Sequence, residues 1–191
     1  GKSTLARVIM RLVTPDAGSL RFAGSDLLAL RGRALRQTRK RVQMVFQDPL
    51  GAFNPRATVG SALADPLRIH AIVPPAERRR AIETLLDRVG LPRAFIGRSI
   101  FEISGGQRQR VAIARALATE PDLIVLDEAV SALDLTVRNR ILELLVDLQR
   151  ERGLSYLFVS HDIAVVRAVS HRIAIMDRGA IVETGPTPAV V

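Results

Sequence analysis

Several short runs along this chain are predominantly apolar, without the regular alternation of apolar and polar positions that a half-exposed strand would show. They lie at residues 42–46, 123–126 and 154–159, and each run ends abruptly in polar residues. A run without alternation is typical of a strand that is buried on both faces, as strands of a parallel sheet are. The pattern therefore predicts a parallel sheet that contains three buried strands.

Stretches with helical spacing separate these runs. In the clearest of them, residues 136–152, the side chains of Ile141, Leu144, Leu145 and Leu148 fall on one face, and Gly153 follows as a helix end. Further helices are expected at residues 5–13, 31–39, 59–70, 76–89 and 111–118. A short strand is expected at residues 19–23, and a hairpin at residues 172–176 and 180–184.

The polar residues that follow the buried runs are the first candidates for chemistry. Asp127 and Glu128 come directly after the run at residues 123–126. In open parallel sheets, ligands bind at the carboxyl ends of the strands. Two adjacent carboxylates at such an end indicate a metal ion and a water molecule that must be positioned.

Two glycine-containing motifs indicate phosphate groups. Ser104-Gly105-Gly106-Gln107 opens a helical pattern, and a first turn with serine and glycine presents free backbone N–H groups that bind anions. Gly1-Lys2-Ser3-Thr4 matches only the last part of the phosphate-binding pattern G-x-x-x-x-G-K-[ST]. Because the chain begins with glycine rather than methionine, we expect that the natural N-terminus lies further upstream.

Composition narrows the possible classes of function. The 191 residues are enough for one domain, and the lack of cysteine excludes disulfides and thiolate metal sites. No run approaches the roughly 20 apolar residues that span a bilayer. The net charge of +9 raises the question of a nucleic acid or an anionic membrane as partner. The few aromatic residues do not interleave with the arginines as a base-stacking surface requires, so a solvated basic surface is the favoured interpretation.

Together, these motifs resemble those of the ATP-binding cassette (ABC) ATPases. The sequence ISGGQRQRVAIARAL at residues 103–117 resembles the family's signature motif, LIVLDE at 123–128 its Walker B motif, and residues 131–134 its D-loop. The resemblance implies an α/β fold of the P-loop NTPase type, with a mostly parallel sheet flanked by helices and an inserted helical subdomain. It implies one nucleotide-binding domain over residues 1–191, with a RecA-like core at 1–47 and 120–191 and a helical subdomain at about 48–119.

The resemblance also implies which residues contact ATP. Two groups are expected to do so, one on the chain's own phosphate loop and one that faces the nucleotide held by a second subunit. The first group is Gly1, Lys2, Ser3 and Thr4, and the second is Ser104, Gly105, Gly106, Gln107 and Asp134.

For the metal and for catalysis, the resemblance implies a smaller set. Ser3, Gln47 and Asp127 are expected to hold Mg²⁺. Glu128 is expected to act as the general base that polarises the attacking water, and His161 to contact the γ-phosphate. Gln47 is expected to contribute to catalysis as well as to metal binding.

Residues 54–60 resemble the family branch that imports dipeptides, oligopeptides and nickel. This branch implies transmembrane permease subunits and a second ABC ATPase subunit, identical or different, as partners, and indirectly an extracytoplasmic solute-binding protein. It implies a peripheral position at the cytoplasmic face of the membrane, and no nucleic-acid partner is expected. Two alternatives stay open: a soluble ABC ATPase that acts on nucleic acid, and a non-catalytic fragment of a cassette.

Overall fold

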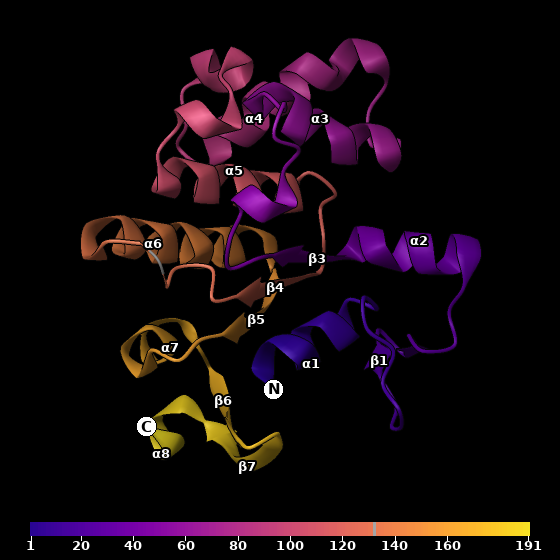
Figure 1. Ribbon diagram of the computed structural model, residues 1–191, viewed down its shortest axis with the longest axis vertical. Coiled ribbons are helices and arrows are strands. Elements are labelled where there is room, and N and C mark those ends of the chain that lie inside the picture. The colour runs from indigo at the N-terminus through magenta and orange to yellow at the C-terminus, as the bar shows by residue number, and fades with distance from the viewer. Residues whose placement is uncertain (132) are drawn as a thin grey trace.

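A parallel sheet of three strands, in the order β3-β4-β5, lies at the centre of the computed structural model, which describes residues 1–131 and 133–191 (Figure 1). The strands are β3 (Val42–Val45), β4 (Leu123–Asp127) and β5 (Ser155–Val159). Both neighbouring pairs run parallel, so the carboxyl ends of all three strands lie at the same edge. The predicted parallel sheet is confirmed, although Gln43 and Met44 of β3 are only half-buried.

The middle strand and the outer strand β5 differ in burial. In β4, Ile124, Val125 and Leu126 are buried, as expected for a strand with neighbours on both sides. The prediction of a fully buried β5 is wrong, because Ser155 is exposed and only Val159 is buried within the strand. In the part of the chain that the structure describes, β5 pairs with β4 alone.

A cavity of about 660 Å³ explains this partial burial of β5. Its wall includes Leu157 of β5 and Ile173 and Ile175 of β6 (Arg172–Asp177). β6 forms a separate antiparallel sheet with β7 (Ala180–Pro186). The edge of β5 that is turned away from β4 therefore borders this cavity instead of another paired strand.

The two faces of the sheet are covered by different helices (Figure 1). Ile124 and Leu126 of β4 belong to the large core that includes residues of α5 and α6, whereas Val125 packs with Ala6 on the opposite face. Ala6 lies on α1 (Lys2–Ile9), and α6 spans Leu135–Arg152. Because successive side chains of a strand point to opposite faces, a single run of aliphatic residues supports both layers.

A layer of helices lies on one side of the sheet, with α5 nearest to the strands and the other helices beyond it (Figure 1). We call it the helical layer; it consists of α3 (Val59–Ile69), α4 (Arg78–Arg88), η3 (Arg93–Gly97) and α5 (Gly105–Leu117). Close approach of α3 to η3 depends on Gly60, since a Cβ there would lie 2.7 Å from Ile96 Cγ2 and 2.9 Å from the Ile96 carbonyl oxygen. A side chain at position 60 would therefore push the two elements apart.

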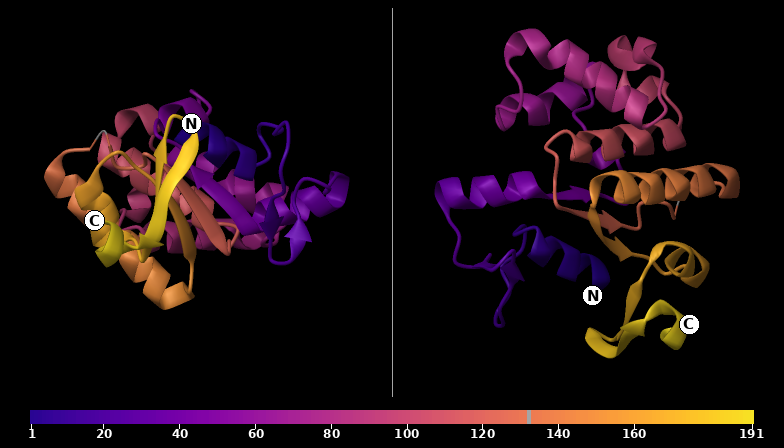
Figure 2. Two further views of the ribbon diagram at one scale, coloured as in Figure 1. Left: turned by 90° about the horizontal axis from the view of Figure 1, so that it is seen from below. Right: turned by 180° about the vertical axis from the view of Figure 1, so that it is seen from behind.

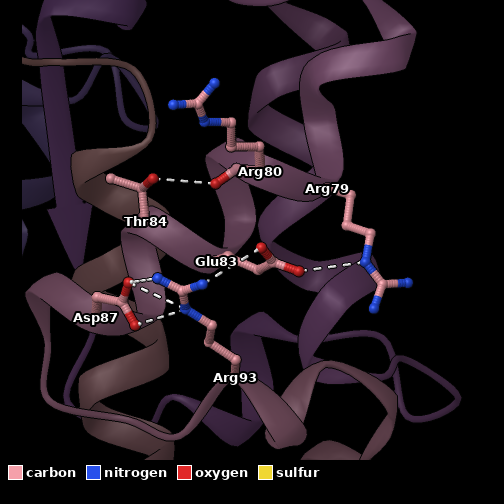
Figure 3. A network of polar contacts seen from close by, with 6 residues as sticks. All are labelled: Arg79, Arg80, Glu83, Thr84, Asp87 and Arg93. Atoms are coloured by element: carbon pink, nitrogen blue, oxygen red, sulfur yellow. Dashed lines mark hydrogen bonds and ion pairs between the residues drawn. The ribbon is translucent and has the colours of Figure 1, made fainter.

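The outer surface of the helical layer carries a network of ion pairs (Figure 3). Arg93 contacts both Asp87, at 2.6 Å, and Glu83, at 3.8 Å, while Arg79 contacts Glu83 at 3.2 Å. The hydrogen bonds from Arg93 lower the pKa of the Asp87 carboxyl and raise the pKa of the arginine. The network joins α4 to η3, although exposed ion pairs of this kind contribute little stability individually.

Two tight hairpins have the same turn chemistry. At the tip of β6–β7, Arg178 and Gly179 have φ values of 44° and 89°, and at the tip of β1–β2, Ala23 and Gly24 have 48° and 80°. Positive φ at both central residues is the geometry of a type I′ turn, whose twist matches that of the flanking strands. The predicted C-terminal hairpin is confirmed, and the strand expected near residue 21 is the first of a short pair, β1 (Arg21–Phe22) and β2 (Ser25–Asp26).

The remaining elements lie around the sheet, and the helical layer and the β6–β7 hairpin occupy opposite ends of the molecule (Figure 2). They are α2 (Gly32–Arg41), α7 (Ile163–Val169), α8 (Thr187–Val190), η1 (Leu50–Ala52), η2 (Pro75–Glu77) and η4 (Ile100–Glu102). The helix expected over residues 76–89 is divided into η2 and α4. None of the described helices combines the length and the hydropathy that a membrane span requires.

Candidate active site

The carboxyl edge of the sheet gathers polar residues from three strands that are far apart in the sequence. Gln47 lies just after β3, Asp127 and Glu128 lie at the end of β4, and His161 follows β5. Helix α1 begins at the same edge, because Ser3 Oγ donates a hydrogen bond to Asp127 Oδ1 at 3.0 Å. The parallel register thus brings these predicted site residues together.

Asp127 is the most deeply placed of these polar groups, with 4% of its surface exposed. A buried carboxylate is costly unless a partner compensates its charge, and among the described residues only Ser3 forms a side-chain hydrogen bond with it. Oxygen donors of this type suit Mg²⁺, which commonly combines one or two protein ligands with water and phosphate oxygens. The described residues contain no cluster of three or more His, Cys, Asp or Glu side chains that would hold a metal alone. Ser3 and Asp127 therefore fit a cation that also binds the phosphates of a substrate.

Glu128 connects the other two predicted catalytic residues. Gln47 Nε2 donates a hydrogen bond to Glu128 Oε2 at 3.1 Å, and His161 Nδ1 lies 3.2 Å from Glu128 Oε1. The imidazole of His161 is otherwise open, with 65% of its side chain exposed. A carboxylate held from both sides in this way is positioned to accept a proton from a water molecule.

The backbone around Glu128 is strained and firmly held. Its φ of 49° lies in the left-handed region, which costs a non-glycine residue about 1 kcal/mol or more. The Glu128 N–H donates to the Val159 carbonyl oxygen at 2.9 Å, and Ser131 donates to the Glu128 carbonyl oxygen through both its N–H and its hydroxyl. These contacts fix the backbone in a conformation in which the Glu128 side chain reaches Gln47 and His161.

The start of α1 carries the predicted phosphate-binding residues. Lys2 is the first residue of the helix and is exposed, as is Thr4. Gly1 precedes the helix and lies against β6, since a Cβ there would be 3.1 Å from Met176 Sδ. Of these four residues, Ser3 contacts Asp127 through the hydrogen bond from its hydroxyl, and a phosphate ligand shared by all four stays a prediction.

The signature residues form a second group at the start of α5. The Ser104 hydroxyl accepts a hydrogen bond from the Gln107 N–H at 3.3 Å, and the Gln107 side chain accepts one from the Ser104 N–H at 2.9 Å. This reciprocal capping box fixes the first turn of α5. At Gly105 a Cβ would meet open space, whereas at Gly106 it would collide with Val137 of α6. Gly106 is thus required by close helix packing.

Asp134 belongs to the predicted D-loop, whose Ala132 lies outside the described residues. Its Oδ1 accepts a hydrogen bond from the Val137 N–H at 3.0 Å, so Asp134 is the N-cap of α6. Within residues 1–131 and 133–191, no hydrogen bond or ion pair joins Ser104, Gln107 or Asp134 to Lys2 or Ser3. The predicted nucleotide-binding residues therefore form two separate groups in this single chain.

One charged residue of this region was not predicted from the sequence. Arg138, in the first turn of α6, forms an ion pair with Asp162, which directly follows His161. Nothing in the local pattern distinguishes Arg138 from the other arginines of the same helix. Its partner lies 24 positions further along the chain, so the pair becomes visible only in the structure.

Comparison with known families decides the identity of the fold. A family model described as "ABC transporter" matches residues 1–131. The chain belongs to the ABC transporter family. In agreement with this, the chain superposes with a TM-score of 0.86 on the ATP-binding cassette MJ0796, in a dimeric structure of a post-hydrolysis state bound to ADP and Pi. That match has 31% identity and covers 98% of this chain and 81% of the other.

A second solved structure of the ABC family gives the same result. It is CbiO1 from Clostridium perfringens, described as part of the ABC transporter complex CbiONQ, with 28% identity and a TM-score of 0.86. The match covers 100% of this chain and 74% of that one. The predicted α/β fold of the P-loop NTPase type is therefore confirmed.

Curated relatives of the ABC family are similar over the whole chain. The glutathione import ATP-binding protein GsiA of Escherichia coli K12 is 47% identical over 190 residues, and the probable peptide ABC transporter ATP-binding protein y4tS of Sinorhizobium fredii is 48% identical over 190 residues. The chain spans 30% of the length of GsiA and 54% of the length of y4tS. The resemblance to the peptide-importer branch, predicted from residues 54–60, is confirmed by these relatives.

Proposed function

We propose that this chain binds and hydrolyses ATP as part of a subunit that powers an ABC importer for peptides or similar small solutes. The observation that carries the proposal is the meeting of Gln47, Glu128 and His161 at the carboxyl edge of the sheet, beside the Ser3–Asp127 hydrogen bond. The similarity to importer ATP-binding proteins supports the transport role.

In this proposal, the start of α1 binds the phosphates of ATP. Backbone N–H groups at the helix N-terminus attract anions, and the ammonium group of Lys2 adds a positive charge there. The hydroxyl of Ser3, the carboxylate of Asp127 and the amide of Gln47 are the proposed Mg²⁺ ligands. When bound, Mg²⁺ neutralises negative charge on the phosphate oxygens.

Hydrolysis then depends mainly on positioning. Glu128 takes a proton from water as the water oxygen bonds to the γ-phosphorus, and the bond between that phosphorus and the bridging oxygen of ADP breaks. His161 and Gln47 both contact the Glu128 carboxylate and thus hold it in place. Phosphate and ADP are the products.

The signature group completes the site of a second subunit. Ser104–Gln107 and Asp134 make only local hydrogen bonds in the described part of the chain, which leaves them available to a nucleotide held elsewhere. A head-to-tail dimer, with an identical or a different ABC subunit, would bring each signature to the partner's ATP. In this arrangement, residues 1–47 and 120–191 act as the RecA-like core and residues 48–119 as the helical subdomain.

A groove of about 320 Å³ between β3 and the helical layer is the proposed docking site for the permease. Phe46, Phe53 and Ile69 contribute apolar surface to it, and His70 lies at its side. Burial, followed by the charges of Arg36 and Lys40, lowers the pKa of His70. Arg39 and Arg115 add positive charge beside these apolar side chains, and such a mixed surface suits an amphipathic helix of a partner. Docking there would place the chain peripherally at the cytoplasmic face of the membrane, with the solute-binding protein as an indirect partner.

The first test is equilibrium binding of Mg-ATP. The chain has only two lysines, so Lys2→Ala has a matched control in Lys40→Ala on the exposed surface of α2. We expect Lys2→Ala to weaken binding at least about tenfold and Lys40→Ala to leave it unchanged. A form extended upstream of Gly1 is measured in parallel. If neither the chain nor the extended form binds Mg-ATP, the proposed function is wrong.

The alternative that the chain acts on nucleic acid has one observation in its favour. Among the described residues of α2 and the arginine before it, only Arg41 pairs with a carboxylate, so that stretch carries uncompensated positive charge. Binding through such charges weakens steeply with salt. We expect no nucleic-acid binding at physiological salt, which a titration with labelled DNA and RNA over a range of salt concentrations would measure.

A further inference from the structure

We propose that Arg138 is a positioning residue for hydrolysis, which fixes His161 relative to the start of α6 and to the signature helix. This inference rests on the proposed ATPase function. It concerns a residue outside the motifs by which the site was predicted, and it follows from contacts that converge on the first turn of α6.

The guanidinium of Arg138 joins two segments of the site. Its Nη1 donates to Asp162 Oδ2 at 2.8 Å, and its Nη2 lies 3.4 Å from the carbonyl oxygen of Leu133. Only 23% of the Arg138 side chain and 35% of the Asp162 side chain are exposed. The ion pair is therefore better shielded from water and salt than those on the outside of the helical layer.

Asp162 in turn fixes the backbone next to His161. Its Oδ1 accepts hydrogen bonds from the N–H groups of Ala164 and Val165 and so caps α7, while its own N–H donates to Ser160 Oγ at 3.0 Å. Because Oδ1 of Asp162 binds these two N–H groups, the other oxygen, Oδ2, is the one that binds Arg138. The side chain of His161 is largely exposed and, among the described residues, has one polar contact, with Glu128, so its position depends on this backbone.

The same turn of α6 also touches the signature helix. Val137, the neighbour of Arg138, packs so closely on Gly106 that a Cβ at Gly106 would collide with it. Contacts therefore run without a gap from Gly106 to Val137 and, through Arg138 and Asp162, to the backbone of His161. A shift of α5 against α6 would therefore also move His161, whose imidazole contacts Glu128.

Stability alone does not account for Arg138. Its Nε is buried and has no hydrogen-bond partner among the described residues, which is an energetic cost. A partly buried ion pair can often be replaced by apolar side chains without loss of stability. A charged residue that carries such a cost is better explained by the geometry it imposes on Asp162.

The experiment measures ATP hydrolysis by the full-length subunit assembled with its permease, for Arg138→Gln and for the control Arg140→Gln. Arg140 is exposed on the same helix and has no ion pair within residues 1–131 and 133–191. We expect Arg138→Gln to lower kcat about tenfold while KM for ATP stays within about twofold. Arg140→Gln should match the unchanged protein, and Arg138→Lys, which keeps the charge, should recover part of the rate.

A double-mutant cycle separates positioning from general damage. Asp162→Asn keeps an oxygen that can cap α7 but removes the negative charge, so it should lower kcat as Arg138→Gln does. The double variant should be no slower than either single variant, because both changes remove the same contact. Additive losses, an unchanged kcat in Arg138→Gln, or a fall in ATP affinity equal to the fall in rate would overturn the proposal. Absence of ATP binding and hydrolysis in the unchanged subunit would instead overturn the proposed function.

Discussion

In the helical layer, side chains such as Leu63 and Leu86 are completely buried, and the charged residues Arg79, Glu83, Asp87 and Arg93 are paired with one another on the surface. At the carboxyl edge of the sheet, by contrast, Gln47 and His161 both contact the carboxylate of Glu128, and Glu128 has a strained backbone. The buried side chains of the helical layer stabilise the fold, whereas the polar groups at the carboxyl edge lie where a substrate can reach them. Substitutions in the two regions should therefore affect different measurable quantities.

The largest effect is expected at the carboxyl edge. Glu128→Gln removes the proposed proton acceptor but keeps the size of the side chain, so we expect the hydrolysis rate to fall at least about a hundredfold. The free energy of unfolding should change by less than about 1 kcal/mol, because the left-handed backbone is unaltered. Steady-state phosphate release and denaturant unfolding measure the two quantities. Glu143→Gln, at an exposed position of α6, is the control, and near-normal hydrolysis by Glu128→Gln would refute the role of Glu128.

The opposite result is expected inside the helical layer. Leu63→Ala leaves a cavity at a position without exposed surface, which should lower the free energy of unfolding by about 3 kcal/mol. Under conditions in which the variant is still folded, its Mg-ATP affinity should be unchanged. Ile69→Ala, at a site of α3 with 46% exposure, should cost less, about 1 kcal/mol or below. Equal losses at both positions would show that burial does not explain the stability of this layer.

Gly106 lies at the contact between the helical layer and α6, and substitutions there test how tightly the two pack. Gly106→Ala should lower the free energy of unfolding by about 1–3 kcal/mol, because the new methyl group collides with Val137. Val137→Ala removes the obstructing methyl groups, so the double variant should regain much of the lost stability. Thermal unfolding of the two single variants and the double variant measures this. If Val137→Ala gives no recovery, the glycine is required for another reason.

The smallest effect concerns the ion pairs of Figure 3 and depends on pH. Arg93 lowers the pKa of Asp87 below its ordinary value of 3.8, so the stabilisation is fully present above that pH and is lost as the pH falls through the lowered pKa. Arg93→Gln should therefore slightly lower the melting temperature at about pH 7 and have little effect at about pH 2. Arg80→Gln, whose side chain makes no ion pair among the described residues, is the control. An effect of Arg93→Gln that is independent of pH would exclude the ion pair as its cause.

The sequence predicted the elements that depend on local patterns. The aliphatic runs gave the three parallel strands, and the polar residues after them gave the edge where Gln47, Glu128 and His161 meet. Burial of β5 was predicted wrongly, because a run of apolar residues does not reveal whether a neighbouring strand covers its edge. Helix α7 was not predicted, since its short apolar sequence lacks a clear helical period.

Contacts between distant segments could not be read from the sequence. The reason for glycine at position 106 is a side chain 31 positions away on another helix, and the Arg138–Asp162 pair spans 24 positions. Such pairs are decided by how α6 packs on α5 and on the residues after β5. Propensity and spacing describe each helix separately and carry no information on this packing.

The open edge of β5 has a consequence for the exchange of backbone hydrogens with solvent. Amide hydrogens of a parallel strand alternate between its two neighbours, so only some of those in β5 are bonded to β4. In the described part of the chain, the others face the cavity beside β6 without a strand to accept them. They should exchange with deuterium through small local openings, whereas the amides of β4 should exchange only when the whole fold opens. Neighbouring residues of one short strand would then differ in protection by as much as residues at opposite ends of the molecule.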